Sequence, residues 1–265
     1  MINIDEVEAD LLKLPQINCP VTHRFGPGLY IREVFMPKGS YVVGHKHKTT
    51  HLNIMLMGVL GIMNDDGTET VLTAPQTFVA PPGRKIVYIY EDTIWQNVHA
   101  TDETDVEKLE ATYLDKSATF LEHYATRPAN YSEDTEDFYA AIAEFGLDPL
   151  TARQLSEIEE DQIPFPLGDY KVMVTQSAIE GKGLFATGNF AANELIAPGR
   201  LDGKRTPAGR YTNHSKTPNA EMVMDEHGDI YLFAIRDIEG CKGGGLGEEI
   251  TIDYRHALGL ASRSN

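Results

Sequence analysis

Eight short segments between residues 29 and 99 are rich in Val, Ile, Tyr, Thr and Met, the residues that β-strands favour. Turn-forming sequences such as PKG, NDDG and PPG separate these segments. Short strands at even spacing, with turns between them, are typical of all-β barrels and jelly rolls. We therefore predict a mainly β fold whose first domain, residues 1–110, is a barrel or jelly roll with strands over 29–36, 40–44, 51–57, 59–63, 69–73, 77–80, 86–90 and 93–99.

Three histidines fall early in this predicted barrel, in the pattern Gly39-(five)-His45-Lys-His47-(three)-His51. Residues two apart on a strand share a face, so His45 and His47 point to the same side, and His51 has the same parity. Three imidazoles that converge inside a small barrel suit a divalent transition metal such as Zn²⁺, Fe²⁺ or Ni²⁺. The spacing resembles the first motif of the cupin family, with His51 where that family usually has Glu. The resemblance implies a metal-binding, cupin-like domain.

A fourth metal ligand is expected further along the chain. The sequence PPG at 81–83 resembles the second cupin motif, but Ile86 stands where that family has a metal-binding histidine. A two-residue turn at Glu91 and Asp92 would fold the last two predicted strands into a hairpin and bring His99 close to this position. His99 is therefore our candidate fourth ligand. The alternative is that these histidines lie on the rim of the barrel and bind no metal.

The stretch 111–167 loses the β pattern and gathers acidic residues. It holds twelve Asp and Glu against three Lys and Arg, in a chain of net charge −17. Ser132 followed by acids predicts a helix start and Gly146 its end, while Asp148 and Pro149 open a second helix. We expect an acidic helical connector between two domains. A charge of this sign disfavours nucleic acid and attracts a basic partner.

Three motifs follow one another in the last part of the chain: GKGLFAT at 181–187, RYTNHSKTPNA at 210–220 and GEEITIDY at 247–254. In this order they resemble the motifs of the SET domain, the fold of S-adenosylmethionine-dependent protein-lysine methyltransferases. The resemblance implies a SET-like β-fold with a pseudoknot over residues 168–265, and Tyr254 as the catalytic tyrosine. The cofactor-binding positions that it implies are Gly181, Lys182, Gly183, Leu184, Tyr211, Asn213 and His214.

Two departures from the SET pattern keep other functions open. The stretch between Gly183 and Asn213, where chromatin-type members hold the substrate peptide, is short, and the cysteine-rich zinc segment after the last motif is missing. The first hypothesis is a protein-lysine methyltransferase with a metal-binding cupin-like domain, acting on a lysine-containing, basic protein. The second is a non-catalytic structural or interaction protein that reuses both folds, such as a virion component. The third is a cupin metalloenzyme.

Composition and targeting signals bound the cellular context. The chain has no run of eighteen apolar residues and no apolar segment near its N-terminus, which predicts neither a membrane span nor a secretory signal. Two cysteines are too few for a disulfide framework. We expect a cytoplasmic protein and leave self-association open. The two-part combination resembles small SET-domain proteins of tailed bacteriophages, which implies the host cytoplasm or a virion.

Overall fold

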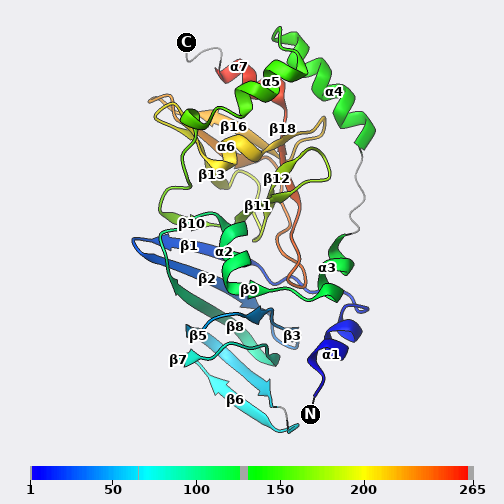
Figure 1. Ribbon diagram of the computed structural model, residues 1–265, viewed down its shortest axis with the longest axis vertical. Coiled ribbons are helices and arrows are strands. Elements are labelled where there is room, and N and C mark those ends of the chain that lie inside the picture. Colours follow the sequence, from blue (N-terminus) through cyan, green and yellow to red (C-terminus); the bar gives the residue numbers. More distant parts are fainter. Residues whose placement is uncertain (1, 65, 126–130, 262–265) are drawn as a thin grey trace. The chain divides into compact units, whose positions relative to one another are not determined.

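The computed structural model describes residues 2–64, 66–125 and 131–261 (Figure 1). The chain divides into two compact units, and each consists of separate stretches of sequence. The first unit comprises residues 1–127, 166–171 and 240–246, and the second comprises 128–165, 172–239 and 247–265. Of the connector expected over 111–167, residues 128–165 belong to the second unit and the rest belong to the first. Among the described residues, no helix combines the length and the apolar character needed to cross a membrane.

The first unit is built mainly from strands, as predicted. Its elements in chain order are α1 (Ile4–Leu11), β1 (Val21–Gly26), β2 (Leu29–Met36), β3 (Tyr41–Val43), β4 (Lys46–His47), β5 (His51–Met63), β6 (Glu69–Thr73), β7 (Gln76–Ala80), β8 (Ile86–Ala100), α2 (Val106–Tyr113), β9 (Leu114–Asp115), α3 (Ala118–Ala125) and β10 (Gly168–Tyr170). The main sheet has the order β10-β1-β2-β8-β5-β6, with β3 attached to β8 and β7 attached to β5. This order has two ends, so the strands of the described residues do not close into the expected barrel. The core holds Met36, Met55, Leu60, Ile89 and Trp95.

The predicted hairpin at Glu91 and Asp92 is wrong, because β8 continues through both residues. Two-residue hairpin turns need a left-handed backbone, which Gly and Asn supply and which Glu and Asp supply less readily. The first half of β8 pairs with β3 and β5, and its second half pairs with β2 and β5. The irregularity lies in β5 instead. The register of its pairing with β8 shifts on either side of Gly58, a residue with a φ of 98°.

The second unit combines strands with helices, which occur at both ends of its sequence and between β14 and β15. Its elements are α4 (Tyr131–Glu144), α5 (Pro149–Ser156), the 3₁₀ helix η1 (Glu159–Asp161), β11 (Val172–Gln176), β12 (Lys182–Ala186), β13 (Leu195–Leu201), β14 (Lys204–Arg205), α6 (Pro207–Tyr211), β15 (Asn213–His214), β16 (Ala220–Met224), β17 (Ile230–Ala234), β18 (Glu249–Ile252) and α7 (Tyr254–Ala261). Its described strands form two sheets, of order β11-β12-β18-β15 and β14-β13-β17-β16.

The end of α4 and the start of α5 lie where the sequence predicts, whereas α4 is described from Tyr131, one residue before the predicted start at Ser132. Gly146 follows α4 with a φ of 71°, a left-handed conformation that glycine adopts at low cost. The carboxylate of Asp148 accepts hydrogen bonds from the N–H groups of Leu150 and Thr151 at the start of α5. Helix α4 packs against α5 and α7, and this contact places its residues beside the end of β18.

The glycine-rich stretch 240–246 is an ordered part of the first unit. The N–H of Cys19 donates to the carbonyl of Cys241 over 3.1 Å, and the N–H of Gly243 donates to the carbonyl of Ile17 over 2.8 Å. A Cβ atom on Gly245 would lie 2.2 Å from the ring of Tyr124. The glycines therefore permit close packing in this stretch.

Candidate functional site

The parallel pairing of β15 with β18 brings the second and third motifs together. Asn213 lies opposite Thr251 and His214 opposite Ile252, and the N–H of Ser215 donates to the carbonyl of Ile252 over 3.0 Å. The motif residues that precede and follow these strands are thereby placed side by side. The structure brings together two of the predicted cofactor-binding residues and the turn that carries the predicted catalytic tyrosine.

The side chain of Asn213 ties the glycine-containing first motif to β18. Its Nδ2 donates to Oε1 of Glu249 over 2.7 Å and lies 3.3 Å from the backbone carbonyls of both Glu180 and Lys182. The carboxylate of Glu249 also accepts from the hydroxyl of Ser177 over 2.8 Å. The side chain of Asn213 is therefore a brace between segments far apart in the sequence.

The first motif supplies backbone and close packing at this site. Gly181 has a φ of 50°, and a Cβ atom placed on it would meet open space. Gly183 is in close contact with β18, since a Cβ atom there would lie 2.2 Å from Oε1 of Glu249. Lys182 is exposed, whereas Leu184 is fully buried opposite Ile250. The side chain of Leu184 thus contributes to the core.

Both ring nitrogens of His214 are held by hydrogen bonds. Nδ1 accepts from the backbone N–H of Tyr254 over 3.2 Å, and Nε2 lies 3.0 Å from the carboxylate of Asp137 in α4. Because a backbone N–H can only donate, Nδ1 carries no proton, and the proton on Nε2 is donated to Asp137. Arg255 binds the same carboxylate through two nitrogens at 2.8 and 3.0 Å. The tautomer and orientation of His214 are fixed from both sides.

Tyr254 lies at the turn where β18 ends and α7 begins. Its hydroxyl donates to the carbonyl of Thr212 over 3.1 Å, and its ring contacts Phe138 edge to face at a centroid distance of 5.7 Å. The ring of His214 is 5.3 Å away. Burial raises the pKa of Tyr254 to about 12, so the phenol is neutral at physiological pH. The phenol oxygen can accept a hydrogen bond from a nearby N–H group.

The end of α6 supplies buried donors without partners. Nε and Nη1 of Arg210 are buried and form no hydrogen bond within the described part of the chain. The guanidinium carbon of Arg210 lies 5.1 Å from the ring centre of Tyr211, a predicted cofactor-binding residue. Helix α6 packs against β12, which begins within the first motif. A buried guanidinium with free donors favours an anionic group beside it.

Sequence reasoning missed three residues of this site. Glu249 and Arg210 lie within the quoted motifs, and each could have been flagged as a charged residue beside apolar ones. Asp137 lies in the acidic stretch, where neighbouring acids of the same type hide its role. Only the packing of α4 against α7 distinguishes its carboxylate from theirs.

The first unit stacks three of its four predicted metal ligands against one another, and the fourth, His45, lines the same cavity as His47 and His51. The ring centres of His47 and His51 are 4.0 Å apart, and those of His51 and His99 are 5.6 Å apart. His99 arrives there because Val98 pairs with Leu52 in β5, and not through the predicted hairpin. His45 instead contacts Phe120 edge to face at 4.6 Å.

These imidazoles do not fit the predicted metal site. Nowhere in the described residues are three or more His, Cys, Asp or Glu side chains arranged to hold a metal ion. Imidazole ligands of one metal point their nitrogens at a common centre. The rings of His47 and His51 are instead stacked at an interplanar angle of 17°. Burial, followed by neighbouring charges, lowers the pKa of His47 to about 3 and that of His99 to about 4, so both are neutral at pH 7.

The chain is similar to several solved cupin structures. A cupin domain from Bordetella pertussis Tohama I is 15% identical with a TM-score of 0.28, and the match covers 33% of this chain and 98% of that one. A cupin-2 domain protein from Shewanella frigidimarina is 17% identical with a TM-score of 0.25, covering 38% of this chain and 95% of that one. An RmlC-like cupin from Methanocaldococcus jannaschii is 14% identical with a TM-score of 0.26, covering 34% and 85%.

The remaining comparisons concern sequence. No curated protein matches this chain. The family model that matches is the SET domain, over residues 199–255. The matched stretch contains Tyr211, Asn213, His214 and Tyr254 and begins after the GKGLFAT motif. Residues 199–255 are therefore similar to a SET domain, the family whose motifs the sequence resembles.

Proposed function

We propose that the second unit binds S-adenosylmethionine and transfers its methyl group to lysine side chains of proteins. The observation that carries this proposal is the pairing of β15 with β18, which places Asn213 and His214 beside Tyr254. These residues lie within the stretch that matches the SET domain model. Their side chains are buried or half-buried and are held by hydrogen bonds, as a preorganised site requires.

The residues of the second unit fit the proposed cofactor. S-adenosylmethionine carries a carboxylate, and its sulfonium holds a methyl group that a neutral amine can attack. The free buried donors of Arg210 suit that carboxylate. The open space at Gly181 allows a ligand to approach the backbone of the first motif closely. Asn213 and His214 would hold the cofactor through backbone groups, because their side chains are already engaged.

Tyr254 would orient the substrate amine without exchanging a proton. Its hydroxyl hydrogen is donated to the carbonyl of Thr212, which leaves the oxygen lone pairs to accept from an amine N–H. With a pKa raised to about 12, the phenol does not serve as the base near pH 7. A free lysine at pH 7 pays about 4–5 kcal/mol to lose its proton, since its ordinary pKa is near 10.4. An apolar surrounding that disfavours the ammonium reduces this cost, and Phe138 against Tyr254 contributes such a surface.

The substrate that we propose is a lysine-containing, basic protein segment. Helices α4 and α5 and the stretch around them carry most of the acidic residues of the region 111–167. Opposite charge would steer a basic segment to the second unit and raise its association rate at low salt. Labelling of basic proteins should therefore fall as the ionic strength rises.

Titration calorimetry with S-adenosylmethionine tests the cofactor. We expect saturable binding by the wild-type chain and clearly weaker binding by Arg210→Met, because the free guanidinium donors are lost. Arg153→Met is a matched control, since Arg153 is exposed on α5 and pairs with Glu157. Absence of any heat at millimolar cofactor would rule the proposal out.

Incubation with methyl-labelled cofactor and lysine-rich proteins tests the reaction. Tyr254→Phe should lower the labelling rate at least tenfold, since the amine loses the oxygen that orients it. Tyr90→Phe should leave the rate unchanged, because Tyr90 is exposed in the first unit and its hydroxyl contacts Glu69. Equal rates for wild type and Tyr254→Phe would exclude the proposed role of Tyr254.

A second candidate is an interaction protein that retains this fold without the reaction. The short stretch between Gly183 and Asn213 favours it, because chromatin-type SET members hold the substrate peptide there. Cofactor binding without any labelled product would support this candidate over the first.

A further inference from the structure

The inward face of the main sheet in the first unit changes from polar to apolar along its strands. Residues on β2, β8 and β5 that lie opposite one another form rows across the sheet. Side chains two residues apart on each strand share this face, so successive rows line one interior. From the polar end to the apolar end, these rows are Tyr30–His99, Arg32–Asn97–Asn53 and Val34–Trp95–Met55.

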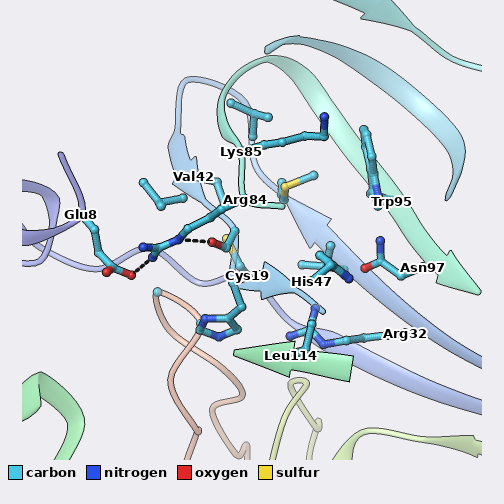
Figure 2. A pocket seen from close by; sticks show the side chains of 18 of the residues that line it. Glu8, Cys19, Arg32, Val42, His47, Arg84, Lys85, Trp95, Asn97 and Leu114 are labelled. Carbon is cyan, nitrogen blue, oxygen red and sulfur yellow. Dashed lines mark hydrogen bonds and ion pairs between the residues drawn. The ribbon is translucent and has the colours of Figure 1, made fainter. Parts of the chain in front are cut away.

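A cavity of about 330 Å³ runs along this graded face. Its volume lies at the small end of the range of ligand pockets. Figure 2 shows Arg32, His47 and Asn97 on one side of the pocket, with Trp95 farther along β8. The apolar part of the lining includes Val34, Met36, Leu60, Val87 and Trp95. A ligand that fills this space needs a polar head and an apolar body.

The unsatisfied polar atoms of the lining are nitrogens. Nε of Arg32, Nδ2 of Asn53 and Nδ1 of both His45 and His47 are buried without a hydrogen-bond partner among the described residues. Asn53 cannot be turned to offer its oxygen instead, because Oδ1 accepts from the indole N–H of Trp95 over 2.9 Å. An indole N–H only donates, so the amide orientation is fixed. Nε of Arg32 and Nδ2 of Asn53 can only donate, so the polar end favours a ligand that brings acceptors to them, while Nδ1 of a neutral imidazole can donate or accept.

The charges at the polar end favour an anion. Nε of Arg32 lies 3.7 Å from Oε1 of Glu110, within ion-pair range but beyond hydrogen-bond range. Glu110 is also bound by Lys116 over 2.7 Å, so one largely buried carboxylate faces two cations. Arg84 also lines the cavity, but it is already paired with Glu8 and Asp5 and donates to the carbonyl of Gly44. Lys85 lines the cavity too but is exposed, so Arg32 is the largely buried lining cation that shares its carboxylate with a second cation.

We propose that this cavity binds a small amphipathic carboxylate, with its head at Arg32, Asn53 and His47 and its apolar body against Trp95, Leu60 and Val34. A carboxylate supplies acceptors for the unsatisfied donors and balances the second cation beside Glu110. The apolar rows then remove the hydrocarbon part from water. This site requires no metal ion and is independent of methyl transfer by the second unit.

Tryptophan fluorescence reads the cavity directly, because Trp95 is the only tryptophan of the chain and lines it. We use the full chain and titrate it with octanoate, 1-octanol and octylamine, which share the apolar tail and differ in the head group. Octanoate should bind at least tenfold tighter than 1-octanol and should shift the emission, and octylamine should bind more weakly still. Equal affinities for octanoate and 1-octanol would overturn the proposal, since the head group would then be irrelevant.

Arg32→Gln tests the head-group contact. It should weaken octanoate at least tenfold and leave 1-octanol unchanged, provided that the urea unfolding midpoint shows a folded first unit. Arg24→Gln is the matched control: Arg24 lies on the neighbouring strand β1, pairs with Glu33 and Asp169, and is not part of the lining. If Arg32→Gln does not fold, the head-group series on the wild type decides alone.

Chelation separates this site from a metal-dependent one. Octanoate affinity should be the same before and after dialysis against EDTA, because nitrogen donors of the chain hold the ligand. Loss of binding on chelation, restored by Zn²⁺ or Fe²⁺, would contradict the proposal and return the histidines to the metal-binding role expected from the sequence.

Discussion

Glu249 is the residue through which the three motifs of the second unit are joined. Its carboxylate binds Asn213 of the second motif and Ser177, which precedes the first motif, while its backbone pairs with Phe185. Gly183 packs directly against the same carboxylate. A change at any of these positions acts on the others, because they share one group.

Gly183→Ala should disturb this junction. The added methyl would lie 2.2 Å from Oε1 of Glu249 and would displace it from Asn213. We expect the free energy of unfolding to fall by about 1–3 kcal/mol and the S-adenosylmethionine affinity to fall about tenfold. Urea unfolding and titration calorimetry measure the two effects.

Gly259→Ala is the control for that substitution. Gly259 lies in α7, where an added methyl meets nothing within 4 Å. Alanine in a helix is favoured over glycine by up to about 1 kcal/mol, so this variant should be as stable as the wild type or slightly more so. If both variants behave alike, close packing at Gly183 is not what matters.

Helix α4 is the element whose role goes furthest beyond the motifs. Its Asp137 holds His214 and Arg255, and its Phe138 covers the ring of Tyr254. Arg255 also binds Glu144 near the end of the same helix over 2.8 Å. The helix therefore fixes the turn between β18 and α7, although it is separated in sequence from both.

Asp137→Ala should loosen that turn. His214 loses its acceptor and Arg255 loses two of its bonds, so we expect the free energy of unfolding to fall by about 1–3 kcal/mol. Glu136→Ala, at an exposed neighbouring position, should change it little. Urea unfolding followed by circular dichroism measures both. A stability equal to wild type in the Asp137 variant would show that α4 is held by apolar contacts alone.

Lowering the pH should reduce the free energy of unfolding of the first unit already at pH values where most carboxylates are still ionised. Burial lowers the pKa of His23, His45 and His47 to about 3, against an ordinary value of 6.5 in the unfolded chain. Between these values the unfolded chain binds more protons than the folded one, so stability is full above pH 6.5 and falls as the pH drops toward 3. Each such histidine steepens the loss by about 1.4 kcal/mol per pH unit.

His47→Gln tests this dependence. Its unfolding free energy, followed through Trp95 between pH 7 and pH 4.5, should fall less steeply than that of the wild type, by close to one proton. His227→Gln is the control and should keep the wild-type slope, because His227 lies in the second unit, outside the unit whose unfolding Trp95 reports. A wild-type slope in the His47 variant would mean that His47 is protonated in the folded state.

Local signals predicted the strands and helices well where turn chemistry is unambiguous. The predicted strands 29–36 and 69–73 have the bounds of β2 and β6, and Asp148 caps α5 as expected. The break predicted at Glu91 and Asp92 failed because β8 changes partners there without turning. Strand β1 was missed although its buried and half-buried residues alternate regularly.

The candidate site was predictable only where its residues belong to a motif. Asn213, His214 and Tyr254 were found from the sequence, and β15 pairing with β18 brings them together. Asp137 was not, since its role depends on how a distant helix packs. For the histidines of the first unit, the spacing in the sequence predicted that they lie close together. It could not predict that the rings of His47 and His51 stack.

The ordered stretch 240–246 has a consequence for how the chain acquires its structure during synthesis. The first unit includes residues 166–171 and 240–246, and the backbone N–H of Cys19 donates a hydrogen bond to the carbonyl of Cys241. Synthesis must therefore reach residue 246 before the first unit is complete, and by then residues 128–165 and 172–239 of the second unit have already been made. The first unit is thus completed only after most of the second unit has been made, although the second unit still needs residues 247–265, and a fragment that stops at residue 127 lacks both β10 and the backbone hydrogen bond from Cys19 to Cys241.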